Sequence, residues 1–180
     1  MPLRLVQVNI KAREDAALGR FWADALGWGV ASEGPGVTNV EPAGFVYPDP
    51  AVLYIDVVTV PDPETVDYRV HLDLATTSAE HQRELVARLT GLGATPVDIG
   101  QGDVPWTVLA DPEGNAFCVL EPREVYRDTG PIAAVVAGCA DPRTLARFWG
   151  AATDWTVHEV TDDFASLRSA TGAGPFLEFI

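Results

Sequence analysis

The sequence predicts an α+β fold built from three copies of one βαβββ unit, and the main observation is an internal repeat. The segment Leu18–Trp28, which reads LGRFWADALGW, returns as LARFWGAATDW at Leu145–Trp155, displaced by 127 positions. A more divergent copy lies between them, because a strand pattern at Arg69–Leu74 leads into a helix pattern that ends at Gly93. A unit of this size cannot bury its apolar face alone, so the copies must stack on one another.

The first unit, 1–62, opens with a predicted strand at Leu3–Ile10. Val6, Val8 and Ile10 form one apolar face of this strand, and Gln7 and Asn9 lie on the other. Helical spacing of apolar residues then predicts a helix that ends at Gly27, a residue suited to the left-handed backbone position past a helix end. Two further strands are predicted at 37–40 and 52–60, separated by the Pro48–Asp49–Pro50 break.

The second unit, 68–122, repeats this order with more polar helix residues. Val70, Leu72 and Leu74 repeat the apolar face, which places His71 and Asp73 at the positions that Gln7 and Asn9 occupy in the first unit. The sequence from Thr77 to Glu80 has the form of a capping box and predicts the helix start. Strands are then predicted at 106–109 and 117–120, joined by a tight turn at 111–115.

The third unit, 130–180, begins with an alternating strand pattern at 133–138. Asp141 and Pro142 are typical of a helix N-cap followed by proline at the first helical position. Strands are predicted at 156–160, 165–168 and 176–180. An unpaired βαβββ unit exposes a sheet face and edge that favour aggregation. We therefore expect a homodimer that pairs third units across a twofold axis, with a longer protein carrying a fourth unit as the alternative.

Composition excludes several classes of partner. The chain has 180 residues, of which 47% are hydrophobic, and its 12 basic and 26 acidic side chains give a net charge of −14. Such a charge repels nucleic acids and anionic membranes. No apolar run reaches membrane-spanning length and no signal peptide precedes the first strand, so we expect a cytoplasmic protein. Cys118 and Cys139 fit neither a disulfide framework nor a cysteine-type zinc site.

Several motifs together resemble a known family. The chain is similar to glyoxalase-like proteins of the vicinal oxygen chelate superfamily, which also holds bleomycin-resistance proteins, extradiol dioxygenases and epimerases. The motifs are the two Leu-x-Arg-Phe-Trp helices, the strand Arg69–Leu74, Leu92–Gly93–Ala94 and the hairpin Val108–Leu120. The first two units resemble one complete domain, 1–122, and the third resembles half of a second domain. The resemblance implies paired units that curl into a half-open mixed sheet barrel around a cup-shaped cavity.

The resemblance also assigns metal-ligand positions. In metal-dependent members, the first strand of each unit supplies His or Gln and the last strand supplies Glu. The first-strand positions here hold Gln7 and His71, whereas the last-strand positions hold Cys118 and either Tyr54 or, with a two-residue change of register, Asp56. Loss of both glutamates removes the charge that a divalent metal requires. We therefore expect no complete catalytic metal site, with a zinc site of His71, Cys118 and Asp56, and Gln7 as a poor fourth ligand, as the alternative.

The predicted function is the binding of a small organic molecule in the cup between the units. Two alternatives stay open: a metal-dependent lyase, isomerase or dioxygenase of this superfamily, and a non-catalytic dimerisation scaffold whose cup is filled by its own side chains. No catalytic residue is assigned. For His71, the alternative to a pocket role is a hydrogen-bonded core histidine. The predicted ligand-binding residues are Gln7, Asn9, His71, Asp73, Trp106 and Cys118.

Overall fold

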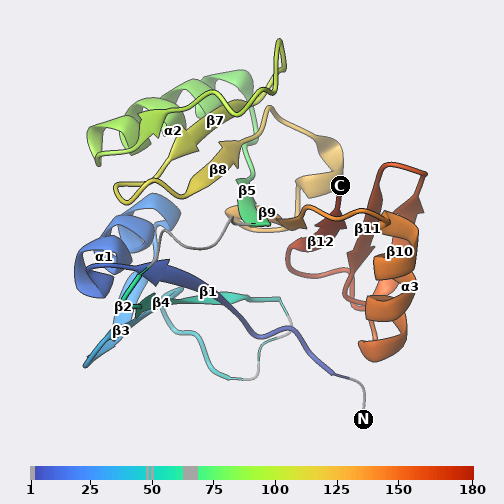
Figure 1. Ribbon diagram of the computed structural model, residues 1–180, viewed down its shortest axis with the longest axis horizontal. Helices are drawn as coiled ribbons and strands as arrows, with labels where there is room; N and C mark the ends of the chain where they lie inside the picture. Colours follow the sequence, from blue (N-terminus) through green and yellow to red (C-terminus); the bar gives the residue numbers. More distant parts are fainter. Residues whose placement is uncertain (1–2, 48, 50, 63–68) are drawn as a thin grey trace.

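The structure contains two β-sheets with helices packed against them (Figure 1). It is a computed structural model that describes residues 3–47, 49, 51–62 and 69–180. Residues 48 and 50 of the predicted Pro48–Asp49–Pro50 break lie outside the described residues. None of the described helices is long and apolar enough to span a membrane. The domain boundaries drawn from the sequence stay a prediction, but the βαβββ order of elements recurs three times along the chain.

The first unit forms a four-stranded sheet in the order β1-β4-β3-β2. β1 runs parallel to β4, and the other neighbours are antiparallel. Gly27, at a φ of 67°, ends the helix in the left-handed position that the sequence predicts. The elements are β1 (Gln7–Ala12), α1 (Asp15–Leu26), β2 (Gly29–Gly34), β3 (Val37–Glu41) and β4 (Tyr54–Thr59).

The second and third units share one eight-stranded sheet, in the order β10-β11-β12-β9-β5-β8-β7-β6. Its two outer strands, β10 and β6, do not pair with each other, so the sheet does not close into a barrel. The second unit contains β5 (Val70–Leu74), α2 (Ala79–Gly91), β6 (Thr95–Pro96), β7 (Thr107–Ala110) and β8 (Ala116–Val119). The third unit follows the 3-10 turn η2 (Glu124–Tyr126) and contains β9 (Ile132–Ala137), α3 (Pro142–Ala152), β10 (Thr156–Val160), β11 (Ala165–Arg168) and β12 (Phe176–Phe179).

The pairing of units differs from the expectation that the first and second units close the cup. β5 pairs with β9 in antiparallel orientation, with Leu72 opposite Val135. Backbone hydrogen bonds continue this pairing at both ends, from Ala75 N–H to the Pro131 carbonyl and from Gly138 N–H to the Arg69 carbonyl. The short connection through η2 brings the third unit back beside the second. The first unit is therefore the one whose first strand has no such partner among the described residues.

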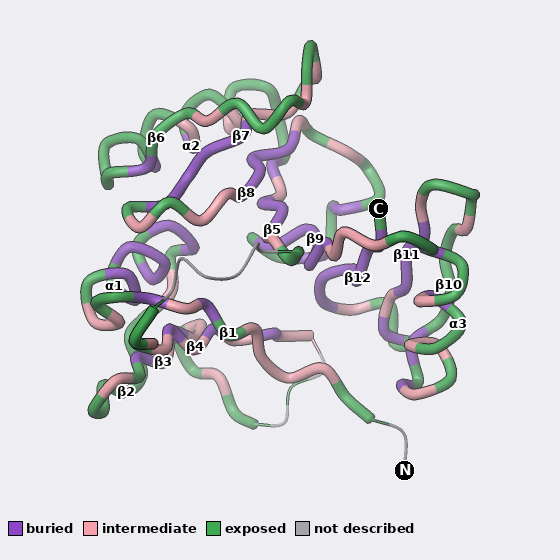
Figure 2. The backbone as a smooth tube through the Cα atoms, in the orientation of Figure 1, coloured by how far each residue is buried: buried purple, intermediate pink, exposed green. Residues whose placement is uncertain are grey.

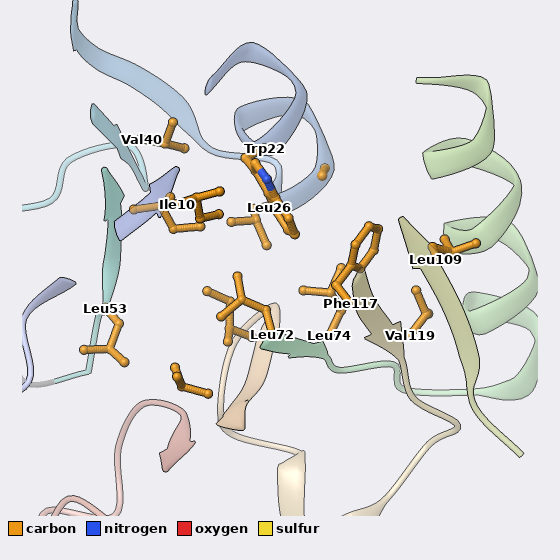
Figure 3. Packing of buried hydrophobic residues seen from close by; sticks show 14 of the residues in the cluster. Ile10, Trp22, Leu26, Val40, Leu53, Leu72, Leu74, Leu109, Phe117 and Val119 are labelled. Atoms are coloured by element: carbon orange, nitrogen blue, oxygen red, sulfur yellow. The ribbon is translucent and has the colours of Figure 1, made fainter. Parts of the chain in front are cut away.

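α1 connects the two sheets through an aromatic core (Figure 3). The rings of Phe21, Trp22 and Phe117 lie within 5.1 to 6.4 Å of one another, centre to centre, at steep angles that favour edge-to-face contact. The Trp22 indole N–H also donates to Asp111 in the β7–β8 turn, at 3.2 Å. Figure 2 shows buried residues in α1 and in the inner strands of the eight-stranded sheet, from β11 to β7, whereas the outer strands β10 and β6 are mostly exposed.

Two local predictions need correction and one is confirmed. Ser78, not Thr77, caps α2, because its hydroxyl accepts from the His81 N–H at 3.0 Å. The first strand begins at Gln7, not Leu3, because Leu3 forms a bridge with Thr153 beyond α3. Asp141 caps α3 as predicted, and its carboxylate accepts from the Thr144 N–H at 2.9 Å.

Candidate functional site

The six residues predicted to line one cup lie on two different sheets. Gln7 and Asn9 belong to β1 of the four-stranded sheet, and the other four belong to the eight-stranded sheet or its flank. Their assignment to ligand binding stays a prediction. The structure therefore presents two groups with separate hydrogen-bond networks, which we describe in turn.

Gln7 and Asp56 are the centre of the first group. The Gln7 amide donates to Asp56 at 2.9 Å and to Asn9 at 2.7 Å, and its oxygen accepts from the Tyr54 hydroxyl at 2.6 Å. Asn39 donates to the other Asp56 oxygen at 2.9 Å. These bonds satisfy Asp56 within the first unit, so it does not join His71 and Cys118. The structure therefore does not group Asp56 with His71 and Cys118, and the alternative zinc site stays a prediction.

Strand register identifies the equivalent last-strand positions. Asn9 lies opposite Asp56, Asp73 opposite Cys118, and Val136 opposite Glu178. Asn9, Asp73 and Val136 occupy the same place in the first strands of their units. The equivalent last-strand position therefore holds Asp56 in the first unit, Cys118 in the second and Glu178 in the third. From the sequence, either Tyr54 or Asp56 could hold the last-strand position of the first unit, and the strand register assigns it to Asp56. Glu178, near the end of the predicted last strand, is a site residue that the sequence reasoning missed.

His71, Asp73 and Cys118 form the second group. The ligand atoms of these three side chains all lie within 4.8 Å of one another. His71 Nε2 lies 3.4 Å from Asp73 Oδ1, yet this buried oxygen has no hydrogen bond to any residue that the structure describes. Burial raises the pKa of the Cys118 thiol, and the neighbouring Asp73 raises it further. Cys118 is therefore a protonated thiol unless a cation replaces the proton.

Glu178 lies on the same side of the eight-stranded sheet as this group. It is 5% exposed, and its carboxylate accepts from the Tyr126 hydroxyl at 2.8 Å. Burial raises the pKa of Glu178 to about 7, and the charge of Asp73 adds to this effect, whereas Tyr126 and Arg123 oppose it. A buried carboxyl group with this pKa exchanges a proton near neutral pH.

Side chains fill much of the sheet face that carries the second group. Phe176 packs edge-on against Tyr126, with ring centres 5.6 Å apart, and the Arg123 guanidinium lies 5.7 Å from the centre of the Trp106 ring. Trp106 therefore contacts the chain's own Arg123. The buried cluster on this face consists of Val108, Cys118, Leu120, Tyr126, Ala133, Ala134, Val136 and Phe176.

A cavity of about 330 Å³ lies where β1 of the first unit faces β5 and β8 of the second. Asn9 and His71 both line it, so it is the place where the two predicted groups meet. Its walls are mostly apolar, and its lining residues are Val8, Asn9, Ile10, Trp22, Val70, His71, Leu72, Ile99, Asn115, Ala116 and Phe117.

A larger cavity of about 580 Å³ lies near η2 and the start of α2, away from the predicted residues. Its basic residues are already engaged: Arg88 donates to the carbonyls of Asp24 and Ala25, and Arg123 pairs with Glu121 at 2.6 Å. Arginine side chains whose hydrogen bonds are made within the protein have few donors left for a ligand. The smaller cavity therefore fits the predicted site better.

The residues at the family's metal positions do not reproduce its ligand set. In the eight-stranded sheet these positions hold His71, Ala134, Cys118 and Glu178, and alanine has no ligand atom. The cluster of His71, Asp73 and Cys118 instead offers one nitrogen, one oxygen and one sulfur, a combination that zinc accepts. The Asp73 Oδ1, which has no hydrogen-bond partner among the residues that the structure describes, is a carboxylate oxygen available to a cation. These three donors fit zinc because Asp73 supplies the oxygen ligand. The sequence analysis did not propose Asp73 as a metal ligand.

Comparisons with known proteins agree with this architecture. The crystal structure of a glyoxalase/bleomycin resistance protein/dioxygenase family enzyme from Burkholderia phytofirmans PsJN is 18% identical, with a TM-score of 0.51, and the match covers 65% of this chain and 97% of that one. For glyoxalase I from Zea mays the identity is 15% and the TM-score 0.65, over 98% of this chain and 66% of that one.

At these identities, the two solved structures show the fold alone. The chain spans just under two thirds of the maize protein. A search of curated protein sequences gives no significant match. The sequence model of the glyoxalase-like domain matches residues 7–120 and 134–180, which is most of the chain. The chain therefore belongs to the glyoxalase-like domain family, within the vicinal oxygen chelate superfamily that its motifs resemble.

Proposed function

We propose that this glyoxalase-like protein binds a small organic molecule in the 330 Å³ cavity between its first and second units. The observation that carries the proposal is the composition of that cavity: apolar and aromatic walls with three polar side chains, Asn9, His71 and Asn115. Ligand pockets in proteins typically have this size and this combination of apolar walls and a few polar groups.

The polar residues define the kind of ligand. Asn9 and Asn115 each offer an amide that both donates and accepts, and His71 offers an imidazole whose side chain is 25% exposed. Asp73 lies beside His71, with its Oδ1 3.4 Å from the imidazole Nε2. A compact ligand with an apolar or aromatic body and one or two carbonyl or hydroxyl groups suits these walls.

An NMR fragment screen tests this proposal. We expect aromatic and aliphatic fragments that carry one hydrogen-bonding group to shift the amide signals of Asn9, His71 and Asn115. The variant A116F places a ring in the cavity and should abolish these shifts. A151F, at an exposed position on α3, is the matched control and should leave them unchanged. Fragments that bind equally well to A116F would contradict the proposal.

Metal-dependent catalysis is the second candidate, and the cluster of His71, Asp73 and Cys118 favours it. A bound zinc ion supplies a Lewis acid that stabilises an enolate or oxyanion next to a carbonyl. The chain's own residues would hold the ion through imidazole nitrogen, carboxylate oxygen and sulfur. Glu178, with its pKa raised to about 7, is able to take or give a proton on the same side of the sheet.

Metal analysis separates the two candidates. If the cluster is a metal site, purified protein should carry zinc in a one-to-one ratio, and Co²⁺ titration should produce the near-ultraviolet absorption of a thiolate–cobalt bond. C118S should lose that absorption, whereas C139S should keep it. Because the Cys118 thiol must lose its proton, binding should weaken as the pH falls. If the protein shows neither stoichiometric zinc nor cobalt absorption, metal-dependent catalysis is contradicted and metal-free ligand binding is the remaining candidate.

A further inference from the structure

We infer, building on the proposed function, that the 330 Å³ cavity selects neutral ligands that carry a hydrogen-bond acceptor and a hydrogen-bond donor together, of which the secondary amide is the simplest kind. Two asparagines line this cavity: Asn9 on β1 and Asn115 in the turn between β7 and β8. An amide side chain both donates and accepts, and hydrogen bonds within the protein decide which of these capacities is left for a ligand.

The carboxylate of Asp111 sets the orientation of Asn115. Asn115 Nδ2 donates to Asp111 Oδ2 at 2.8 Å, and the Asn115 backbone N–H donates to Asp111 Oδ1 at 3.0 Å. An ionised carboxylate only accepts, so Nδ2 and not Oδ1 faces Asp111. Asn115 Oδ1 has no hydrogen bond to any residue that the structure describes. Asn115 therefore offers the ligand an acceptor.

A second carboxylate sets the orientation of Asn9 through Gln7. Gln7 Nε2 donates to Asp56 Oδ2 at 2.9 Å, and the Tyr54 hydroxyl donates to Gln7 Oε1 at 2.6 Å, so both ends of the Gln7 amide are assigned. Gln7 Nε2 also donates to Asn9 Oδ1, at 2.7 Å. The Asn9 oxygen is thus engaged, whereas Asn9 Nδ2 has no partner within the described part of the chain. Asn9 therefore offers the ligand a donor.

The apolar walls of the cavity fit the body of a ligand and not its polar groups. Four of the apolar and aromatic lining residues are labelled in Figure 3: Ile10, Trp22, Leu72 and Phe117. The Trp22 indole N–H donates to Asp111 at 3.2 Å, so this ring presents carbon atoms to a ligand. The polar selection therefore depends on side chains other than Trp22.

His71 is the third polar residue of the cavity. Its Nε2 lies 3.4 Å from Asp73 Oδ1, so this nitrogen is directed to the group of His71, Asp73 and Cys118. None of the described residues that line the cavity is an aspartate, glutamate, lysine or arginine. A charged ligand would lose its hydration here without gaining an opposite charge from such a residue. The cavity therefore favours a neutral ligand.

The donor and the acceptor come from different units. Asn9 belongs to the first unit and Asn115 to the second, so a ligand that satisfies both side chains spans the boundary between the units. An amide supplies a carbonyl oxygen for Asn9 Nδ2 and an N–H for Asn115 Oδ1. A ligand with only one of these groups leaves the other asparagine without a partner, which lowers its affinity.

Three bicyclic fragments of nearly identical shape test this selection. Hydrocarbostyril carries a ring N–H beside a carbonyl, β-tetralone has a methylene group in place of the N–H, and tetrahydroquinoline has a methylene group in place of the carbonyl. In NMR titrations, hydrocarbostyril should bind about tenfold more tightly than either of the others, because each of those loses one hydrogen bond. The apolar areas are nearly equal, so hydrophobic contributions to the three affinities cancel.

Side-chain truncation assigns the two roles. Asn9→Ala should weaken the binding of hydrocarbostyril and β-tetralone about tenfold and leave that of tetrahydroquinoline, which has no carbonyl, unchanged. Asn115→Ala should weaken the binding of hydrocarbostyril and tetrahydroquinoline and leave that of β-tetralone unchanged. Because Asn115 also bonds Asp111, Asn9→Ala decides the test if the Asn115 variant does not fold. Ser32→Ala, at an exposed position on β2, is the matched control and should change none of the affinities.

Contrary results differ in what they say about the cavity. Equal affinities for the three fragments, with binding lost in A116F, would overturn the amide preference and leave the cavity as a binding site. An Asn9→Ala variant that weakens tetrahydroquinoline and not β-tetralone would overturn the assigned orientation of Asn9. If none of the fragments binds, or if all of them bind A116F as well as the wild type, the amide preference and the proposed function are both wrong.

Discussion

Glu178→Gln should stabilise the protein above neutral pH and have little effect in acid. The buried Glu178 carboxyl has a pKa raised from its ordinary 4.5 to about 7, and burial is the largest cause. Between pH 4.5 and about 7, the Glu178 carboxyl group is therefore protonated in the folded protein and ionised in the unfolded chain. Stability consequently falls as the pH rises from 4.5 to 7, and it does not fall further for this group above that range.

The size of the effect follows from the two pKa values. At 1.36 kcal/mol per pKa unit, the raised pKa corresponds to about 3 kcal/mol of stability lost on full ionisation. Glu178→Gln keeps the oxygen that accepts from Tyr126 and removes the ionisation. The variant should thus match the wild type near pH 4 and exceed it by about 3 kcal/mol at pH 8.

Urea denaturation at a series of pH values measures this difference. Ionisable groups common to both proteins cancel when one stability curve is subtracted from the other. The charges of Asp73, Arg123 and Glu159 near Glu178 therefore change the size of the stability difference but do not invalidate the comparison. Glu84→Gln, at an exposed position on α2, is the matched control and should give no pH-dependent difference. A difference that does not change with pH, or a wild type that is the more stable protein at pH 8, would refute the reasoning.

Two further predictions concern the packing of α1 and α2, both measured by urea denaturation. Gly19→Ala should destabilise the protein by about 1 to 3 kcal/mol, because the new Cβ would lie 2.4 Å from Thr38 Cγ2. Gly91→Ala, at a helical glycine with nothing within 4 Å, should instead be neutral or stabilise by about 1 kcal/mol, and equal effects would contradict the steric argument. Trp22→Phe should cost about 1 to 3 kcal/mol, because it leaves the buried Asp111 without the indole N–H, and no loss would show that this bond contributes little.

Local sequence patterns predicted the elements of this fold well because they depend on short-range chemistry. The alternation of Val70, Leu72 and Leu74 placed a strand where β5 lies, with His71 and Asp73 on its other face. Asp141 and Pro142 marked the start of α3, and Gly27 marked the end of α1. Each of these patterns depends only on residues within a few positions of one another in the sequence.

The candidate site was less predictable because it depends on which units pair. Gln7 and His71 occupy equivalent strand positions, and from the sequence alone they were expected in one cup. The structure places them on separate sheets, since β5 pairs with β9 and not with β1. Glu178 was missed for the same reason: it joins the group of His71 and Cys118 only through that pairing.

The contact between Tyr126 and Glu178 suggests why the second and third units are the ones that pair. β1, β5 and β9 all present apolar residues on one face, so this alternation alone does not select a partner. The short connection through η2 carries Tyr126, which is buried and donates to Glu178 on the last strand of the third unit.

The connection therefore contacts β12 as well as joining β8 to β9. Tyr126→Phe keeps the ring packing against Phe176 but leaves the buried Glu178 carboxyl without its donor. The loss of this bond should cost about 1 to 3 kcal/mol of unfolding free energy, more at pH 8 than at pH 5, because the ionised carboxylate depends on the hydroxyl most. Hydrogen exchange should then show faster opening at β9 and β12 than at β3 and β4 of the first unit, and uniform protection would show that the contact does not hold the two units together.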